Sequence, residues 1–175
     1  PAPSAAATAT RSSVPQGEID GIPFEARTVL LWQDPDALWL GFEQGVPVRD
    51  GTFDPFAPRA PERMFAIFID AANLKPGTFQ ARDGNIPKDC AIRYALLQRI
   101  DAASGKIDVI ETRWNVTLRV DHITERKSRD GVTHLSLDGS VDLRFETPHA
   151  TLRGAFAAHD LVRESDVGPD QPHLP

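Results

Sequence analysis

The sequence predicts an all-β fold, an antiparallel β-sandwich or closed barrel of about eight to nine strands. Two stretches, 114–121 and 135–145, carry this prediction because hydrophobic and polar residues alternate along both. A period of two places one set of side chains on each face of a strand. Asp130-Gly131 between them is a favoured pair for a tight hairpin turn. Turn signals recur along the chain, and no stretch has the period of an amphipathic helix.

The same two stretches predict a pairing register. With Asp130 and Gly131 as the loop, the facing pairs are Val120 with Val141, Leu118 with Leu143, and Val116 with Phe145. Hydrophobic residues then meet hydrophobic residues throughout, as expected of a well-specified register.

Shorter stretches predict the strands of the first half of the chain. Residues 17–24 predict a short edge strand and turn, because glycines punctuate them and Pro23 has no amide hydrogen for a central ladder. Residues 25–32 and 37–45 predict a hairpin with Leu38, Leu40 and Phe42 on one face. Residues 46–62 contain four prolines and no periodicity, which predicts a long loop that is either functional or poorly ordered.

The remaining strands are predicted from similar patterns. Residues 63–70 predict a buried strand, and the Pro-Gly turn within 74–79 leads into a short one. Residues 91–100 predict a strand with Ile92, Tyr94 and Leu96 in phase, joined by a turn to a long strand from Lys106. A last strand runs from Leu152 to about Val162.

Composition sets the domain organisation and excludes several partners. Of the 175 residues, 41% are hydrophobic and 25% charged, which is typical of a globular protein. The predicted units are a disordered tether at 1–16, a single β domain at 17–163 and a flexible tail at 164–175. A net charge of −6 gives no general attraction to nucleic acid, and no hydrophobic run is long enough for a transmembrane segment.

The N-terminal tract bears on location. The chain has one cysteine, Cys90, so an intramolecular disulfide, the usual marker of an oxidising compartment, is missing. Residues 1–10 are all alanine, proline, serine or threonine. Such a tract is common just after the cleavage point of a bacterial exported protein or lipoprotein. We therefore expect a periplasmic or outer-membrane-tethered protein, anchored through a residue upstream of Pro1. The alternative is a linker within a longer protein.

Three short motifs carry a family resemblance. They are Gly-Ile-Pro-Phe at 21–24, Leu-Lys-Pro-Gly-Thr-Phe at 74–79 and Leu-Arg-Gly-Ala-Phe-Ala-Ala at 152–158. This order resembles uncharacterised bacterial exported or lipoprotein β-sandwich domains over residues 17–162. The resemblance implies a β-sandwich outside the cytoplasm. It carries no known chemistry and transfers no functional residue.

The histidines do not predict a metal site. His122 shares the phase of the core residues and His134 that of the polar ones, so the two cannot share a metal ion without a bulge. His149, His159 and His173 lie in a turn and near the C-terminal end. No pair has the spacing of strand ligands beside a carboxylate, and we expect no metal and no cofactor.

Catalytic patterns are equally weak. Asp138 and Asp142 share one face with Ser140 between them, which favours a solvated polar face over an acid–base pair. Cys90 follows Lys88, but a buried thiol is favoured over a nucleophile. Four loop residues offer side-chain oxygens to calcium, although their spacing is not that of an EF-hand: Asp50, Asp54, Asp83 and Asn85. With no nucleophile elbow or phosphate loop, the sequence leaves enzymatic activity undecided and favours a non-enzymatic protein.

Binding is the function that the sequence favours. Trp39 has the opposite phase to its hydrophobic neighbours and points outward, which suggests a contact surface. A second sheet covering that face is the alternative explanation. Three cations sit at the hairpin tip, where they either bind an anionic partner or protect the hairpin from edge association. The candidate binding residues are Trp39, Phe53, Phe56, Arg126, Lys127 and Arg129.

Two functions follow. The first is a non-enzymatic exported module that binds a protein or an envelope component through Trp39 and the 46–62 loop. The second is a lipocalin-like barrel that holds a small apolar ligand, with interior space at Gly41, Gly139 and Gly154.

Overall fold

The computed structural model describes residues 14–34, 37–44, 63–100, 107–110, 112–127, 131 and 133–160. Strands make up about three quarters of this part of the chain, which also contains one short 3-10 helix. The strands are β1 (Gln16–Ile19), β2 (Ile22–Glu25), β3 (Thr28–Asp34), β4 (Ala37–Glu43), β5 (Arg63–Ile69), β6 (Gly77–Arg82), β7 (Ile92–Ile100), β8 (Ile107–Ile110), β9 (Trp114–Lys127), β10 (Thr133–Phe145) and β11 (Ala150–Asp160), with η1 (Ala71–Asn73) after β5.

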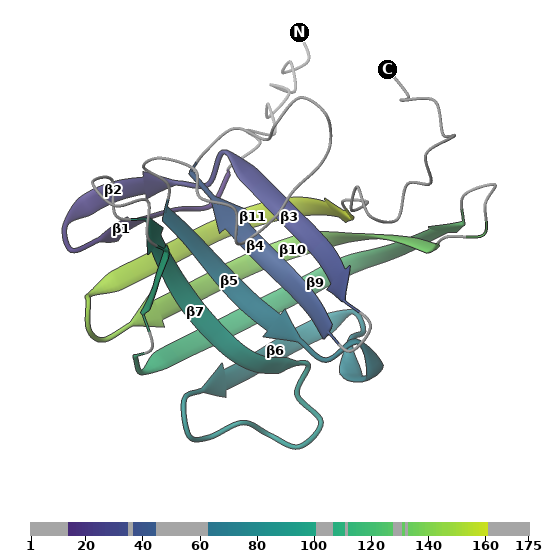
Figure 1. The fold of residues 1–175 in the computed structure, drawn as a ribbon. Coiled ribbons are helices and arrows are strands. Elements are labelled where there is room, and N and C mark those ends of the chain that lie inside the picture. The colour runs from purple at the N-terminus through teal and green to yellow at the C-terminus, as the bar shows by residue number, and fades with distance from the viewer. Residues whose placement is uncertain are drawn as a thin grey trace, which may run out of the picture.

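The strands form two antiparallel sheets that meet at one corner. The hydrogen-bonded order is β6-β9-β10-β11-β3-β4-β5-β7-β8, and β1 pairs with both β11 and β2. At the corner, β11 joins β3 through two parallel pairs, His159 with Leu30 and Asp160 with Leu31. This junction separates a sheet of six strands from a sheet of five. The five-stranded sheet, with β3, β4, β5 and β7, crosses in front of β9, β10 and β11 (Figure 1).

The described part of the chain is therefore sandwich-like, and the predicted all-β antiparallel class is confirmed. Neither sheet closes on itself, so the closed barrel is wrong. Eleven strands are described where about eight to nine were expected. One extra strand arises because 17–24 holds a complete hairpin, in which Asp20 and Gly21 have φ angles of 51° and 75°. Positive φ at both turn positions matches the twist of the flanking strands.

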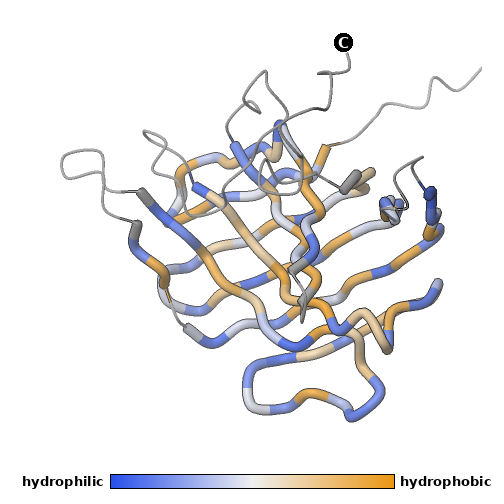
Figure 2. Tube along the Cα trace, turned by 45° about the vertical axis from the view of Figure 1, so that its right-hand side comes forward, coloured by the Kyte–Doolittle hydropathy of each residue, from blue (hydrophilic) through white to orange (hydrophobic). Residues whose placement is uncertain are grey.

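The main hydrophobic core lies between the two sheets. Its largest fully buried side chains come from β3, β4, β5, β7, β9 and β10: Leu31, Leu38, Leu40, Phe42, Phe65, Ile67, Ile69, Ile92, Leu97, Leu118, Leu137 and Phe145. Aromatic rings cross the interface, with Phe42 5.6 Å from Phe156 and Phe65 6.0 Å from Phe145 between centroids. Hydrophobic and hydrophilic segments follow one another along the strands, as the alternation predicts (Figure 2).

The β9–β10 pair keeps the predicted faces but not the predicted register. Val120 lies opposite Gly139 rather than Val141, and the other predicted pairs are likewise displaced by two residues. One residue of the displacement comes from the tip, where Lys127 pairs with Thr133 around a longer loop. The other comes from a β-bulge, at which Asp121 is an extra residue in β9. Because the two shifts add to an even number, the hydrophobic residues still face the core.

A second bulge changes the phase of β7. Phe68 pairs with Tyr94 and Ile69 pairs with Ile92, so Arg93 is an extra residue in β7. Ile92 therefore faces the core and Leu96 faces away from it, whereas Tyr94 packs against both the core and the hydrophobic cluster on the opposite face of the sheet. The predicted common phase of these three residues is wrong for this reason.

The predicted long strand from Lys106 is also two strands in the structure. β8 pairs with β7 in the five-stranded sheet, and β9 pairs with β10 in the six-stranded sheet. The chain passes from one sheet to the other between them. The hairpin of β3 and β4 and the strands β5, β6, β7 and β11 lie where the sequence predicts them.

The three glycines expected to leave interior space do not do so. A Cβ at Gly139 would lie 2.0 Å from the carbonyl oxygen of Arg119, and one at Gly154 would lie 2.8 Å from Cα of Pro15. Gly41 faces away from the core, beneath the ring of Trp32. These glycines permit close approach of neighbouring chain segments, so the interior is filled rather than hollow.

Candidate functional site

The outer face of the five-stranded sheet, turned away from the core, carries a row of aromatic residues. Trp32 pairs with Trp39, Trp39 with Phe68, and Phe68 with Tyr94, on the four neighbouring strands β3, β4, β5 and β7. Cross-strand partners point to the same face of a sheet. We call these four residues the aromatic row.

The rings of the aromatic row contact one another. Trp32 and Trp39 are stacked, with centroids 5.9 Å apart and an interplanar angle of 10°. Trp39 and Phe68 are 4.9 Å apart and tilted by 57°. Tyr94 also meets Trp114 of β9 edge-on at 6.3 Å, so the row ends against the other sheet. Such ring pairs contribute about 0.5–1.5 kcal/mol each beyond the area that they bury.

A second row beside the aromatic row is built from small and aliphatic residues. Leu30, Gly41, Ala66 and Leu96 pair in sequence across the same four strands. A Cβ at Gly41 would lie 2.6 Å from Cζ3 of Trp32, so the glycine gives the indole ring room to lie across β4. A third row pairs Thr28, Glu43, Met64 and Gln98, and it places polar side chains along one side of the face.

Burial divides the aromatic row. The exposed fraction of Trp32 is 3%, and that of Met64 and Leu96 beside it is 5% and 7%. Trp39, Phe68 and Tyr94 are half-buried. The row therefore presents three partly exposed aromatic side chains beside a buried indole.

The outer face of the six-stranded sheet is different, because its side chains are mostly polar and charged. Arg119 binds Asp121 at 2.7 Å, and Asp142 accepts hydrogen bonds from Arg144 at 3.2 Å and Arg153 at 2.5 Å. Partial burial raises the pKa of Asp142, but the hydrogen bonds from the two arginines outweigh it and leave the pKa below 3.8. This is the solvated face that the sequence favours for Asp138 and Asp142. The outer face of the six-stranded sheet is thus mostly charged, whereas that of the five-stranded sheet is mostly aromatic and aliphatic.

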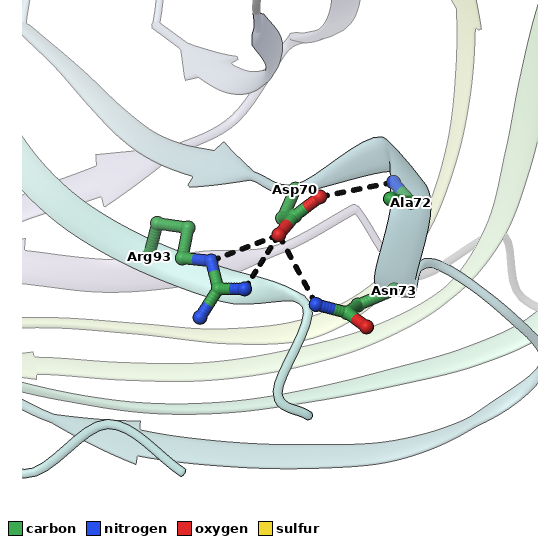
Figure 3. Close-up of polar contacts among 4 residues, drawn as sticks. All are labelled: Asp70, Ala72, Asn73 and Arg93. Atoms are coloured by element: carbon green, nitrogen blue, oxygen red, sulfur yellow. Dashed lines mark hydrogen bonds and ion pairs between the residues drawn. The ribbon is translucent and has the colours of Figure 1, made fainter. Parts of the chain in front are cut away.

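An ion pair between Arg93 and Asp70 lies at the end of the aromatic row (Figure 3). Oδ2 of Asp70 accepts hydrogen bonds from Nε and Nη2 of Arg93 at 3.1 and 2.5 Å and from Nδ2 of Asn73 at 3.1 Å. Oδ1 accepts from the amide of Ala72 at 3.0 Å and caps η1. The bonds from Arg93, followed by those from Ala72 and Asn73, hold the pKa of Asp70 below its ordinary value. The contact ties the end of β5 to the start of β7, next to the paired Phe68 and Tyr94.

The candidate residues from the sequence fall into three groups. Trp39 lies on the outer face, as its phase predicts. Arg126 and Lys127 are exposed near the end of β9, in the other sheet, so the structure does not bring them together with Trp39. Phe53, Phe56 and Arg129 lie outside the described residues.

Sequence reasoning missed the partners of Trp39. Phase alone shows that Trp39 points outward, but not which residues on other strands stand beside it. The placement of Tyr94 depends on the bulge at Arg93, which no pattern in the sequence marks. Trp32 was predicted to share the phase of Thr28 and Leu30, and the structure confirms this.

The histidines of the β9–β10 pair differ from the prediction. Because of the bulge at Asp121, His122 is exposed opposite Asp138, and it shares a face with His134. Four residues along β10 separate Asp138 from His134, which is about 13 Å along a strand. No group of three metal-ligating side chains occurs among the described residues.

The other described residues considered for catalysis or metal binding lie in ordinary structural contacts or turns. Cys90 is buried, with 4% exposed, and its Sγ lies 3.7 Å from the carbonyl oxygen of Gln80. His149 lies 3.6 Å from Glu18 in an exposed pair. Asp83 and Asn85 belong to a tight turn after β6, and Asp50 and Asp54 lie outside the described residues.

Comparisons of the chain with protein-family models, with curated proteins and with solved structures find no match. Over the described part of the chain, no helix is long and hydrophobic enough to cross a membrane.

Proposed function

We propose that this protein is a non-enzymatic binding module that contacts a protein partner through the half-buried part of the aromatic row. The contact residues are Trp39, Phe68 and Tyr94. An exported location, in the periplasm or tethered to the envelope, belongs to the same proposal. It rests on the alanine- and proline-rich residues 1–10 and on the resemblance of three short motifs to exported β-sandwich domains.

The contrast between the two outer faces carries the proposal. The six-stranded sheet covers its outer face with arginine–aspartate pairs, as an antiparallel sheet in contact with water normally does. The five-stranded sheet places four aromatic residues in one row on the corresponding face. The main core lies on the opposite side, and Trp39 packs only partly buried against a smaller hydrophobic cluster on this face, which includes Trp32 and Leu96.

The chemistry of the row favours a protein as the partner. Tryptophan and tyrosine are enriched among the residues that contribute most to protein–protein affinity, because each offers a large contact area at a small entropic cost. Trp32 and Gly41 support the row from beneath, so that Trp39 is held in place before a partner binds. A surface held in place in this way loses less conformational entropy on binding.

The alternative of a barrel around a small apolar ligand is not retained. It needs a closed sheet with a hollow interior, whereas the sheets are open and the core is filled by large side chains.

A site-specific crosslinker tests the proposal. A photoreactive benzoylphenylalanine replaces Trp39 in the full chain expressed in its own cells, and a matched variant carries it at Thr117 on the polar outer face. We expect a discrete crosslinked protein from position 39 and not from position 117. The protein identified by its mass is then purified, and its affinity for the unmodified chain is measured.

The affinity measurement decides the outcome. Trp39→Ala is expected to weaken binding about tenfold or more, as loss of a central aromatic contact does, whereas Thr117→Ala leaves it unchanged. The same crosslinked protein at both positions, or an affinity that Trp39→Ala does not alter, would overturn the proposal. A crosslink between two copies of the chain would assign the row to self-association instead.

A further inference from the structure

A cleft opens at the end of the six-stranded sheet, where β6, β9 and β10 meet the turns around them. It has a volume of about 820 Å³, within the size range of small-molecule sites, and its polar lining includes Arg82, Asp83, Asn85, Arg113, Asn115 and Glu146. A second hollow of about 370 Å³ shares Arg82, Asn85 and Asn115 with it. The shared residues place these three side chains between the two hollows.

Two arginines of this cleft differ from the other arginines of the same sheet face. Arg144, the third arginine of the cleft, binds Asp142, and Arg119 and Arg153 outside the cleft also each bind an aspartate. Arg82 and Arg113 make no ion pair and no side-chain hydrogen bond within the described part of the chain. The N–H donors of their guanidinium groups are therefore not taken up by any described residue.

The backbone brings these donors to one place. Asn115 of β9 pairs with Arg82 of β6 on one side and with Arg144 of β10 on the other. Arg113 lies two residues before Asn115, and its carbonyl accepts the amide of Glu146 at 3.0 Å. Residues two apart on an extended chain point to the same side, so Arg113 and Asn115 share a face. Asn85 joins them because its backbone bridges Arg82 across a tight turn.

We propose that this cleft binds the oxyanion group, phosphate or carboxylate, of a small ligand. Arg82 and Arg113 donate charge-assisted hydrogen bonds to the group, and the amides of Asn85 and Asn115 complete its surroundings. A guanidinium offers paired donors in a plane that match the oxygens of both groups. Asp83 and Glu146 also line the cleft, and their negative charges weaken the binding.

Titration of the full chain with sodium phosphate and with sodium acetate tests this site. Binding is followed through backbone amide shifts in NMR spectra at constant ionic strength, with sodium chloride as the reference salt. We expect saturable shifts at Gly84, Asn85 and Asn115 with at least one of the two anions, and the tighter one identifies the group. Arg82→Gln and Arg113→Gln are each expected to weaken that binding about five- to tenfold.

Two further variants separate recognition from general charge effects. Arg99→Gln, in the exposed pair with Asp108 on the other sheet, leaves the affinity unchanged. Glu146→Gln removes a repelling charge and tightens binding about two- to threefold. The proposal is overturned if neither anion saturates, if chloride produces the same shifts, if Arg99→Gln weakens binding as Arg113→Gln does, or if Glu146→Gln fails to tighten it.

Discussion

The indole rings of Trp32 and Trp39 lie nearly parallel, 5.9 Å apart, across the pairing of β3 with β4. The two residues differ in burial, because Trp32 is 3% exposed whereas Trp39 is half-buried. Gly41 leaves room for the ring of Trp32 on the sheet. Trp32 therefore serves as the base of the outer face, and Trp39 is the member of the pair that remains available for contact.

The bulge at Asp121 predicts an asymmetric response to deletion. Asp121 is the extra residue of β9, so its deletion leaves Val120, His122 and Ile123 in regular alternation opposite β10. The cost is the exposed pair with Arg119, which contributes about 1 kcal/mol or less. We expect the free energy of unfolding, measured by denaturant titration, to change by no more than about this amount.

Deletion of Thr117 is the matched control. This residue lies in the regular part of β9, where losing one position moves the adjoining hydrophobic residues to the wrong face. We expect that chain to lose most of its stability. Equal losses from the two deletions would show that the bulge is required rather than tolerated.

The ion pair of Asp70 with Arg93 predicts a dependence of stability on pH. The folded-state pKa of Asp70 lies below 3.8, so the contribution of the pair is present above the unfolded pKa and is lost as the pH falls through the folded pKa. Asp70→Asn removes the charge but keeps an oxygen for the amide of Ala72. We expect this variant to be less stable than the parent at pH 7 and the difference to shrink near pH 3. A difference that stays constant between these two pH values would contradict the assignment.

Cys90 provides a probe of opening in the β6–β7 region. Its thiol is 4% exposed, so a thiol reagent can reach it only when the surrounding structure opens. We expect labelling in native buffer to be slow and to accelerate through the denaturant transition. Rapid, complete labelling of the native protein would mean that Cys90 is accessible and that its region opens readily.

The fold class follows from local patterns that each strand carries in its own residues. Alternation in 114–121 and 135–145 identifies the β9–β10 pair, and the phase of Leu38, Leu40 and Phe42 identifies the core face of β4. These patterns arise because a strand places successive side chains on opposite faces. They require no knowledge of other strands, so one sequence is enough to predict them.

Register and sheet topology depend on interactions that alternation does not encode. The bulges at Asp121 and Arg93 each add one residue, and each changes which side chains share a face beyond it. The phase of Tyr94 is predicted wrongly because of the bulge at Arg93, and the facing pairs of β9 and β10 because of the bulge at Asp121 and the longer loop at the hairpin tip. The candidate site shows the same difference. Alternation along β4 predicts that Trp39 points outward, but only the pairing of the strands shows that Phe68 and Tyr94 lie in the same row.

The stability of Trp39→Ala compared with Leu40→Ala tests the central claim most directly, because it needs no knowledge of the partner. The two residues are neighbours on β4, and they point to the outer face and to the core. Leu40→Ala is expected to cost about 2–5 kcal/mol in the free energy of unfolding. We expect Trp39→Ala to leave a folded chain and to cost less than Leu40→Ala, because the ring of Trp39 is partly in solvent already. A loss equal to that of Leu40→Ala, or an unfolded chain, would make Trp39 a structural residue and would contradict its role as a contact surface.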